Sequence, residues 1–213
     1  MNKYLINIIS ITEFTWTQFK SKPFFWILVF ACISIVQIFA DSYYGPIIYN
    51  LDVETMSLNF TDSLNRKIIE IILFYFSVSL IKMSIQFMRK KNVDYTMLID
   101  LDATTFLKYI CALLVMSAVI GLGFILFIIP GLYFSVRFIF VPYLIIDGSK
   151  SILDAFYKSW NMTVNNMIDI SLFILILFSL FLFSTVFGQI GLLFMSPFIA
   201  LLKAYFFIVM LKK

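Results

Sequence analysis

Long apolar segments separated by short polar ones organise this chain. Between Phe106 and Ile146 only two side chains, Lys108 and Arg137, carry a charge. A bilayer core of roughly 30 Å is crossed by about 20 helical residues, so this segment predicts two spanning helices. Proline removes a backbone donor and glycine accepts unusual dihedral angles. We therefore expect the hairpin turn between these helices at Pro130-Gly131.

The same pattern predicts six spans in three hairpins. They are Phe24–Ala40, Ile68–Met88, Phe106–Ile128, Leu132–Ile146, Met167–Phe187 and Gly191–Leu211. The fourth is short and contains Arg137 and Pro142, so it is open whether it tilts, kinks or re-enters the membrane. We expect an all-α integral membrane helical bundle that forms one transmembrane domain over residues 1–213.

Two further segments are typical of interfacial amphipathic helices. Ser10–Phe19 and Ser151–Trp160 each begin with serine, place an acid three residues later and carry aromatic residues. This spacing is that of a capping box at a helix start. On the second helix we expect one apolar face, which consists of Leu153, Phe156, Tyr157, Trp160 and Val164.

The likeness of these two segments suggests an internal repeat. Its copies would be residues 10–90 and 151–213, with the hairpin 106–146 between them. Both copies start on the same side of the membrane, which makes the repeat parallel rather than inverted. The alternative interpretation, that any interfacial helix before a span has this pattern, stays open.

The composition agrees with a membrane protein. The chain is 62% hydrophobic and 13% charged, and a soluble domain is about 25% charged. The net charge is +4, but the cations cluster at the ends of apolar segments. We therefore expect a lipid bilayer, and no nucleic acid, as the partner of this charge.

The distribution of charge predicts the orientation of the bundle. The clustered cations are Lys3, Lys20 and Lys22 before the first span, Arg89, Lys90 and Lys91 after the second, Lys150 and Lys158 after the fourth, and Lys212 and Lys213 at the end. The loop from Asp41 to Lys67 is acidic by contrast. By the positive-inside rule, both termini are cytoplasmic.

A search for catalytic chemistry finds little. The chain contains no histidine and only two cysteines, which removes the commonest general base and the usual zinc ligands. No phosphate-binding glycine loop or nucleophile elbow is present. We expect no catalytic, cofactor or metal site, and hence no enzyme.

Three cations inside spans are the candidate site. Lys82, Arg137 and Lys203 each lie in a predicted span, where a charge is costly unless it snorkels, pairs or lines a polar cavity. In one interpretation the lysines snorkel and Arg137 pairs with an acid or with carbonyls. In the other, the three cations and Trp160 border a pocket for an anionic lipid headgroup.

A family resemblance enters in the second half of the chain. Its residues are Pro130-Gly131, Tyr133, Arg137, Pro142, Asp147, Asp154-Ala155, Ser159-Trp160 and Thr163, and the segment Phe14–Pro23 adds to it. This pattern resembles the YciC-like group of bacterial multi-pass membrane proteins. It is also similar to the membrane domain of some glycerophosphodiester phosphodiesterases. The resemblance implies a six-helix protein of the bacterial plasma (inner) membrane, but it implies no reaction.

Three functional hypotheses follow. The first is a non-enzymatic protein that binds lipid or a membrane partner in membrane or envelope homeostasis. The alternative is a small transporter or channel subunit, favoured by the repeat and by prolines in or beside spans. The least favoured is a lipid-acting enzyme that uses Asp147 or Asp154. Small residues at Gly121, Gly123 and Ala200 also suit close helix packing, within the bundle or in a homo-oligomer.

Overall fold

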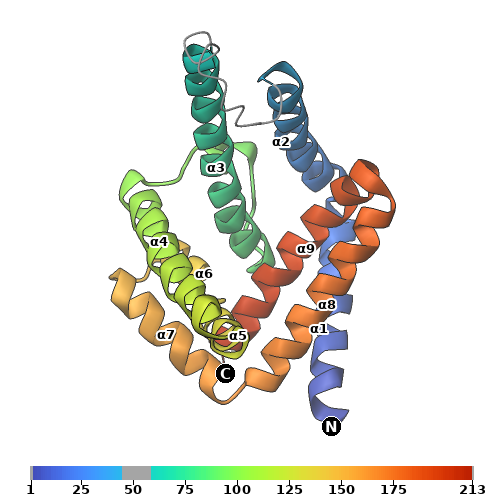
Figure 1. Ribbon diagram of the computed structural model, residues 1–213. Coiled ribbons are helices and arrows are strands. Elements are labelled where there is room, and N and C mark those ends of the chain that lie inside the picture. Colours follow the sequence, from blue (N-terminus) through green and yellow to red (C-terminus); the bar gives the residue numbers. More distant parts are fainter. Residues whose placement is uncertain (1, 45–58, 213) are drawn as a thin grey trace.

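The computed structural model describes residues 2–44 and 59–212, in which the regular elements are helices (Figure 1). Six of its segments are long and apolar enough to cross a membrane. They are Pro23–Ser42, Leu64–Met88, Ala103–Leu126, Ile128–Ile146, Met167–Val186 and Ile190–Leu211. The predicted all-α fold with six spans is therefore confirmed.

Helix α9 forms the centre of the bundle. The α-helices are α1 (Asn2–Ser21), α2 (Pro23–Tyr44), α3 (Asn59–Met88), α4 (Ala103–Leu126), α5 (Ile128–Arg137), α6 (Val141–Ile146), α7 (Ile152–Val164), α8 (Met167–Val186) and α9 (Gly188–Leu211), with a short 3-10 helix, η2 (Tyr95–Leu98), before α4. Helix α9 contacts α1, α2, α3 and α8. Its side chains Leu201, Leu202, Ala204 and Phe207 are fully buried. Segments from both ends of the chain thus meet on one apolar helix.

The turn between α4 and α5 lies at Phe127, where the backbone is extended (φ −159°, ψ 153°). The prediction of a turn at Pro130-Gly131 was therefore wrong. Both residues belong to α5, which begins at Ile128. Proline is tolerated in the first helical turn because N–H groups there have no partner within the helix.

Glycine nevertheless shapes this hairpin, through close approach of the two helices. A Cβ atom built on Gly123 would lie 3.0 Å from Cα of Gly131, which is tighter than nine in ten Cβ contacts in proteins. Small residues allow helix backbones to approach in this way. The pair Gly123 and Gly131 therefore fixes the position of α5 against α4.

The fourth span consists of two pieces. Helix α5 ends at Arg137, and α6 starts at Val141 with Pro142 in its first turn. The interruption at residues 138–140 agrees with the kinked alternative for this span. It also places the end of α5 beside α7, because both α5 and α6 contact that helix.

The two predicted helix starts differ. Ser151 caps α7, since its hydroxyl accepts a hydrogen bond from the Asp154 N–H at 3.1 Å, which confirms this prediction. Ser10 lies inside α1, which begins at Asn2, so the prediction of a helix start there was wrong. The repeat itself stays a prediction.

The predicted single apolar face of α7 is divided in the structure. Leu153 and Tyr157 are exposed, whereas Trp160 is partly buried. The inward side is formed by the small residues Ala155, Ser159 and Thr163. The packed face is therefore the one beside the predicted face, because its small residues let α7 pack closely on α5 and α6.

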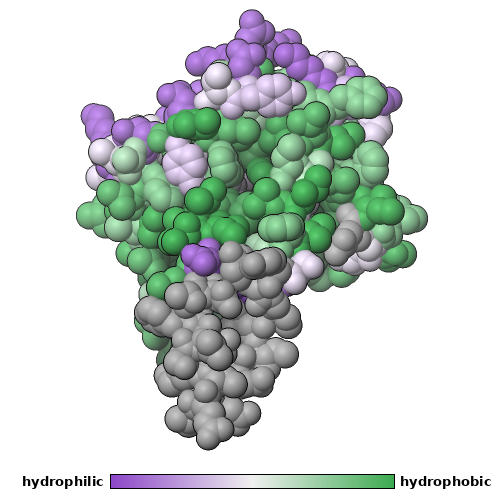
Figure 2. Space-filling view, turned by 90° about the horizontal axis from the view of Figure 1, so that it is seen from above, coloured by the Kyte–Doolittle hydropathy of each residue, from purple (hydrophilic) through white to green (hydrophobic). Residues whose placement is uncertain are grey.

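The surface of the bundle is mostly apolar. Figure 2 shows hydrophobic side chains over most of one face and hydrophilic residues gathered along one edge. Large hydrophobic side chains are exposed on α8, where Phe178 is 59% and Phe181 is 49% accessible. This arrangement fits a bundle whose sides contact lipid chains.

Candidate functional site

The structure places the three intramembrane cations in three different surroundings. Arg137 ends α5, and its side chain is only 7% exposed. Lys82 lies near the end of α3, and Lys203 lies in the second half of α9. Only Arg137 lies beside Trp160, so the four candidate residues do not border one common cavity.

Arg137 occupies a cage made by α5 and α7. Its guanidinium carbon lies 4.8 Å from the ring centroid of Tyr133 and 4.7 Å from that of Trp160. Arg137 donates to the Tyr133 hydroxyl at 2.8 Å and to Thr163 Oγ1 at 3.3 Å. In return, the Ser159 hydroxyl donates to the Arg137 carbonyl at 2.7 Å. The planar guanidinium suits this combination of ring stacking and directed hydrogen bonds.

No carboxylate neutralises Arg137 in the part of the chain that the structure describes. The Nε atom is also buried there without a partner. The first interpretation expected an acid or carbonyl groups as the partners of Arg137, and the structure places aromatic rings and hydroxyl groups there instead. This arrangement joins the kink in the fourth span to α7 and makes Arg137 a connector between two helices.

Lys82 is paired with the segment that precedes α4. Its ammonium donates to the Asp100 carbonyl and lies 3.2 Å from the Asp100 carboxylate. The carboxylate is well exposed. Lys82 thus reaches a polar region beyond its own helix, as snorkelling lysines do.

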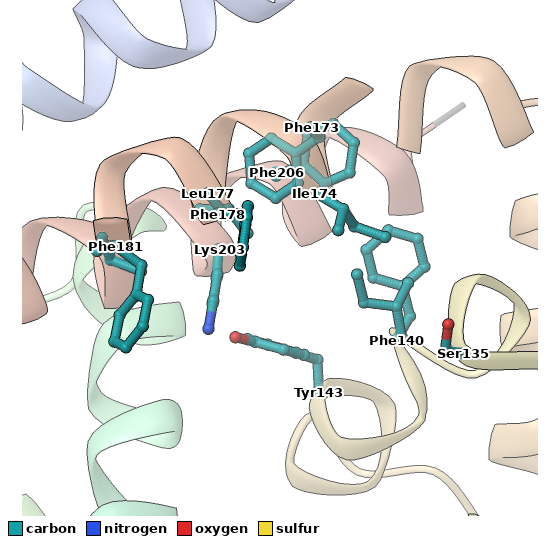
Figure 3. A pocket seen from close by; sticks show the side chains of 12 residues that line it. Ser135, Phe140, Tyr143, Phe173, Ile174, Leu177, Phe178, Phe181, Lys203 and Phe206 are labelled. Atoms are coloured by element: carbon teal, nitrogen blue, oxygen red, sulfur yellow. The ribbon is translucent and has the colours of Figure 1, made fainter. Parts of the chain in front are cut away.

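Lys203 faces a cavity of about 510 Å³ between α5–α6 on one side and α8–α9 on the other. Figure 3 shows Lys203 and Tyr143 pointing toward one another from α9 and α6. Half of the residues that line the cavity are aromatic, namely Phe140, Tyr143, Phe173, Phe178, Phe181 and Phe206. Within the described residues the Lys203 ammonium has no hydrogen-bond or ion-pair partner. We call this cavity the Lys203 groove.

A second cavity of about 360 Å³ adjoins the groove and shares Lys203 and Tyr143 with it. It is richer in hydroxyl groups, which come from Ser77, Ser84, Ser184 and Ser196. The Ser84 hydroxyl is buried and has no hydrogen-bond partner among the described residues. One side of Lys203 is thus aromatic and the other carries hydroxyl groups.

This geometry suits an amphipathic anion. A phosphate or carboxylate at Lys203 would receive a charge-assisted hydrogen bond, and an apolar chain would contact the aromatic wall. The described residues contain no group of three or more histidine, cysteine, aspartate or glutamate side chains that would hold a metal ion. The Lys203 groove thus combines one cation with an aromatic wall.

Sequence reasoning assigned no role in the site to two residues that matter here, Tyr133 and Tyr143. Tyr133 precedes Arg137 by four residues, which is the spacing of neighbours on one helix face. The sequence alone could therefore have indicated this contact. Tyr143 faces Lys203 because α6 is packed against α9, where the Tyr143 ring lies 5.5 Å from that of Phe207. No local pattern indicates such a long-range arrangement.

The fold and its apolar spans define a multi-pass membrane protein. A stretch of 77 residues is 30% identical to a UPF0259 membrane protein of Buchnera aphidicola subsp. Baizongia pistaciae (strain Bp). The match covers 36% of this chain and 31% of that relative's length, so it spans about a third of each. UPF0259 denotes the YciC group, and this similarity supports the resemblance in part. No family model and no solved structure matches the chain.

Proposed function

We propose that this chain is a non-enzymatic protein of the bacterial plasma membrane that binds an anionic lipid in the Lys203 groove. Its role would lie in membrane or envelope homeostasis, with both termini in the cytoplasm. The observation that carries the proposal is the Lys203 ammonium, which faces an aromatic cavity and has no hydrogen-bond or ion-pair partner among the described residues.

The cost of an intramembrane charge supports a ligand at this place. A lysine near the centre of a spanning helix costs about 2.5–3.5 kcal/mol on insertion scales. Lys203 lies about two helical turns before Leu211, the end of α9. Its ammonium points toward Tyr143 and not along α9 (Figure 3). An anionic group bound in the groove would offset this cost.

The shape of the groove favours lipid over a small polar solute. Its volume of about 510 Å³ is that of a ligand pocket, and its lining is mostly apolar. Phe178 and Phe181 line it and are also exposed on the outside of α8. A lipid chain in the bilayer would therefore reach the cavity from the side of the bundle.

Native mass spectrometry of the protein gently released from its membrane tests the proposal. We expect wild type to retain an anionic lipid, and Lys203→Gln to retain at least tenfold less because the charged anchor is gone. Lys212→Gln is the matched control, since it removes the same charge from the end of the same helix. Equal retention by the two variants would refute the groove as the site.

The broken fourth span also favours a second candidate, a small transporter or channel subunit. Interrupted helices line substrate sites in many transporters, and here the break at residues 138–140 contributes Phe140 to the groove. Pro197 lies inside α9 as well. A flux assay in proteoliposomes separates the two functions, because a binding protein without transport activity gives no substrate flux above that of empty vesicles.

A further inference from the structure

A third cavity, which is polar, lies where the C-terminal ends of α3 and α6 meet. It measures about 200 Å³. It is lined by Lys82, Ile85, Gln86, Arg89, Lys91, Ile146 and Asp147. The aromatic lining of the Lys203 groove is replaced here by three cations, one amide and one carboxylate. This cavity is therefore a different kind of site, near the polar ends of two spans.

The charges of the cavity are arranged around one fixed pair. Arg89 holds Asp147 with two hydrogen bonds, Nη1 to Oδ1 at 2.5 Å and Nη2 to Oδ2 at 2.8 Å. This bidentate contact raises the pKa of Arg89 above its ordinary value, through the side-chain hydrogen bond first. Two of the five guanidinium N–H groups are used in this way, which leaves three as donors.

Further donors at the cavity are unused. The ammonium of Lys91 and the side-chain amide of Gln86 have no partner among the described residues. Lys82 adds its charge, shared with Asp100. Three cations thus surround one carboxylate that is already engaged, and the cavity offers an excess of positive charge to an anion.

The backbone fixes Lys91 in this position. Helix α3 ends in a turn in which the Lys90 N–H bonds to the Phe87 carbonyl and the Lys91 N–H bonds to the Gln86 carbonyl. Lys90 has φ of +59°, in the left-handed region that usually requires glycine. The turn brings Lys91 back beside Gln86. Its residue in the left-handed region is Lys90, where a glycine is usual.

We propose that this cavity binds a phosphate group, held by Lys91, Gln86 and the remaining N–H groups of Arg89. The phosphate belongs either to a lipid headgroup or to a free anion, since the chemistry of recognition is shared. Basic pockets between helices at a membrane surface bind lipid headgroups in this manner. The site uses none of the residues that line the Lys203 groove, so it does not depend on the proposed function.

Equilibrium dialysis of the full chain in a neutral detergent, with radiolabelled inorganic phosphate at constant ionic strength, is the first arm of the test. The second arm is native mass spectrometry after equilibration with phosphatidylglycerol or phosphatidylcholine. The test variant is Lys91→Gln. Lys90→Gln is its matched control, because it removes the same charge from the adjacent residue, which does not line the cavity.

We expect Lys91→Gln to weaken binding about tenfold and Lys90→Gln to leave it unchanged, because only the first removes a charged donor from the site. Saturable binding of inorganic phosphate with this difference supports a free anion. Retention of phosphatidylglycerol alone, with the same difference, supports a lipid headgroup. Equal effects of both variants would show general surface charge and overturn the proposal, as would the absence of binding in both arms. The same measurements on Lys203→Gln show whether any bound lipid lies in the Lys203 groove and not in this cavity.

Discussion

Arg137 and Lys203 are both cations within spans, yet their surroundings are opposite. Arg137 is enclosed by two aromatic rings and two hydroxyl groups from α5 and α7. Lys203 faces an open aromatic cavity, and its ammonium lacks a partner among the described residues. A guanidinium with several protein partners connects helices, whereas a cation without one is free to bind a ligand. The contrast separates a structural charge from a candidate binding charge.

Replacing Arg137 should give the largest loss of stability. Arg137→Ala removes two cation–π contacts and two charged hydrogen bonds, so the free energy of unfolding should fall by about 3 kcal/mol. Reversible unfolding in mixed micelles measures this change. Lys203→Ala should alter the same quantity by less than about 1 kcal/mol, since it breaks no hydrogen bond or ion pair among the described residues. Equal losses in the two variants would remove the distinction between the cations.

A shift of α5 against α4 should disturb the Arg137 cage but not Lys203. Gly123→Ala places a Cβ atom 3.0 Å from the backbone of Gly131 and should cost about 1–3 kcal/mol. Gly121→Ala is the matched control, because no atom lies within 4 Å of its added Cβ. It should be neutral or slightly stabilising. If both variants unfold alike, the close approach of α4 and α5 does not support the cage.

A single contact within the cage should have a smaller effect. Thr163→Val keeps the shape of the side chain but removes the hydroxyl that Arg137 Nη1 contacts at 3.3 Å. We expect a loss of about 1 kcal/mol, because this hydrogen bond is long and Arg137 keeps its other partners. The same unfolding measurement applies. A loss as large as that of Arg137→Ala would mean that Thr163, and not the rings, holds the arginine.

The smallest expected effect is a pH dependence of stability at the start of α7, the helix that contains Trp160. A hydrogen bond from Lys158 is the main cause that lowers the pKa of Asp154. Because the pKa of Asp154 is lower in the folded than in the unfolded protein, its carboxylate stabilises the fold at pH values above its unfolded pKa of about 3.9. This stabilisation is lost as the pH falls through the folded pKa. The protection of the amides in the first turn of α7, measured relative to their intrinsic exchange rate at each pH, should therefore fall in acid. Asp154→Asn should lower this protection at neutral pH and make it less sensitive to acid.

The spans were predictable from the sequence because hydropathy over a length of about 20 residues is a local property. The cap at Ser151 was predictable for the same reason. The predicted turn was misplaced because Pro130 and Gly131 both belong to α5. Pro130 lies in its first turn, and Gly131 allows close packing against α4. The surroundings of Lys203 and Arg137 depend on how α6 and α7 pack, and helix packing is not encoded in any short pattern.

We propose that Lys203 binds a ligand and that Arg137 holds the fold. Lipid retention and unfolding free energy, measured together in Lys203→Gln and in Arg137→Lys, test both roles. We expect Lys203→Gln to lose bound anionic lipid while its stability stays near that of wild type. We expect Arg137→Lys to lose stability, because lysine lacks the planar fork, while the folded fraction keeps its lipid. Loss of lipid in Arg137→Lys with full retention in Lys203→Gln would contradict both roles.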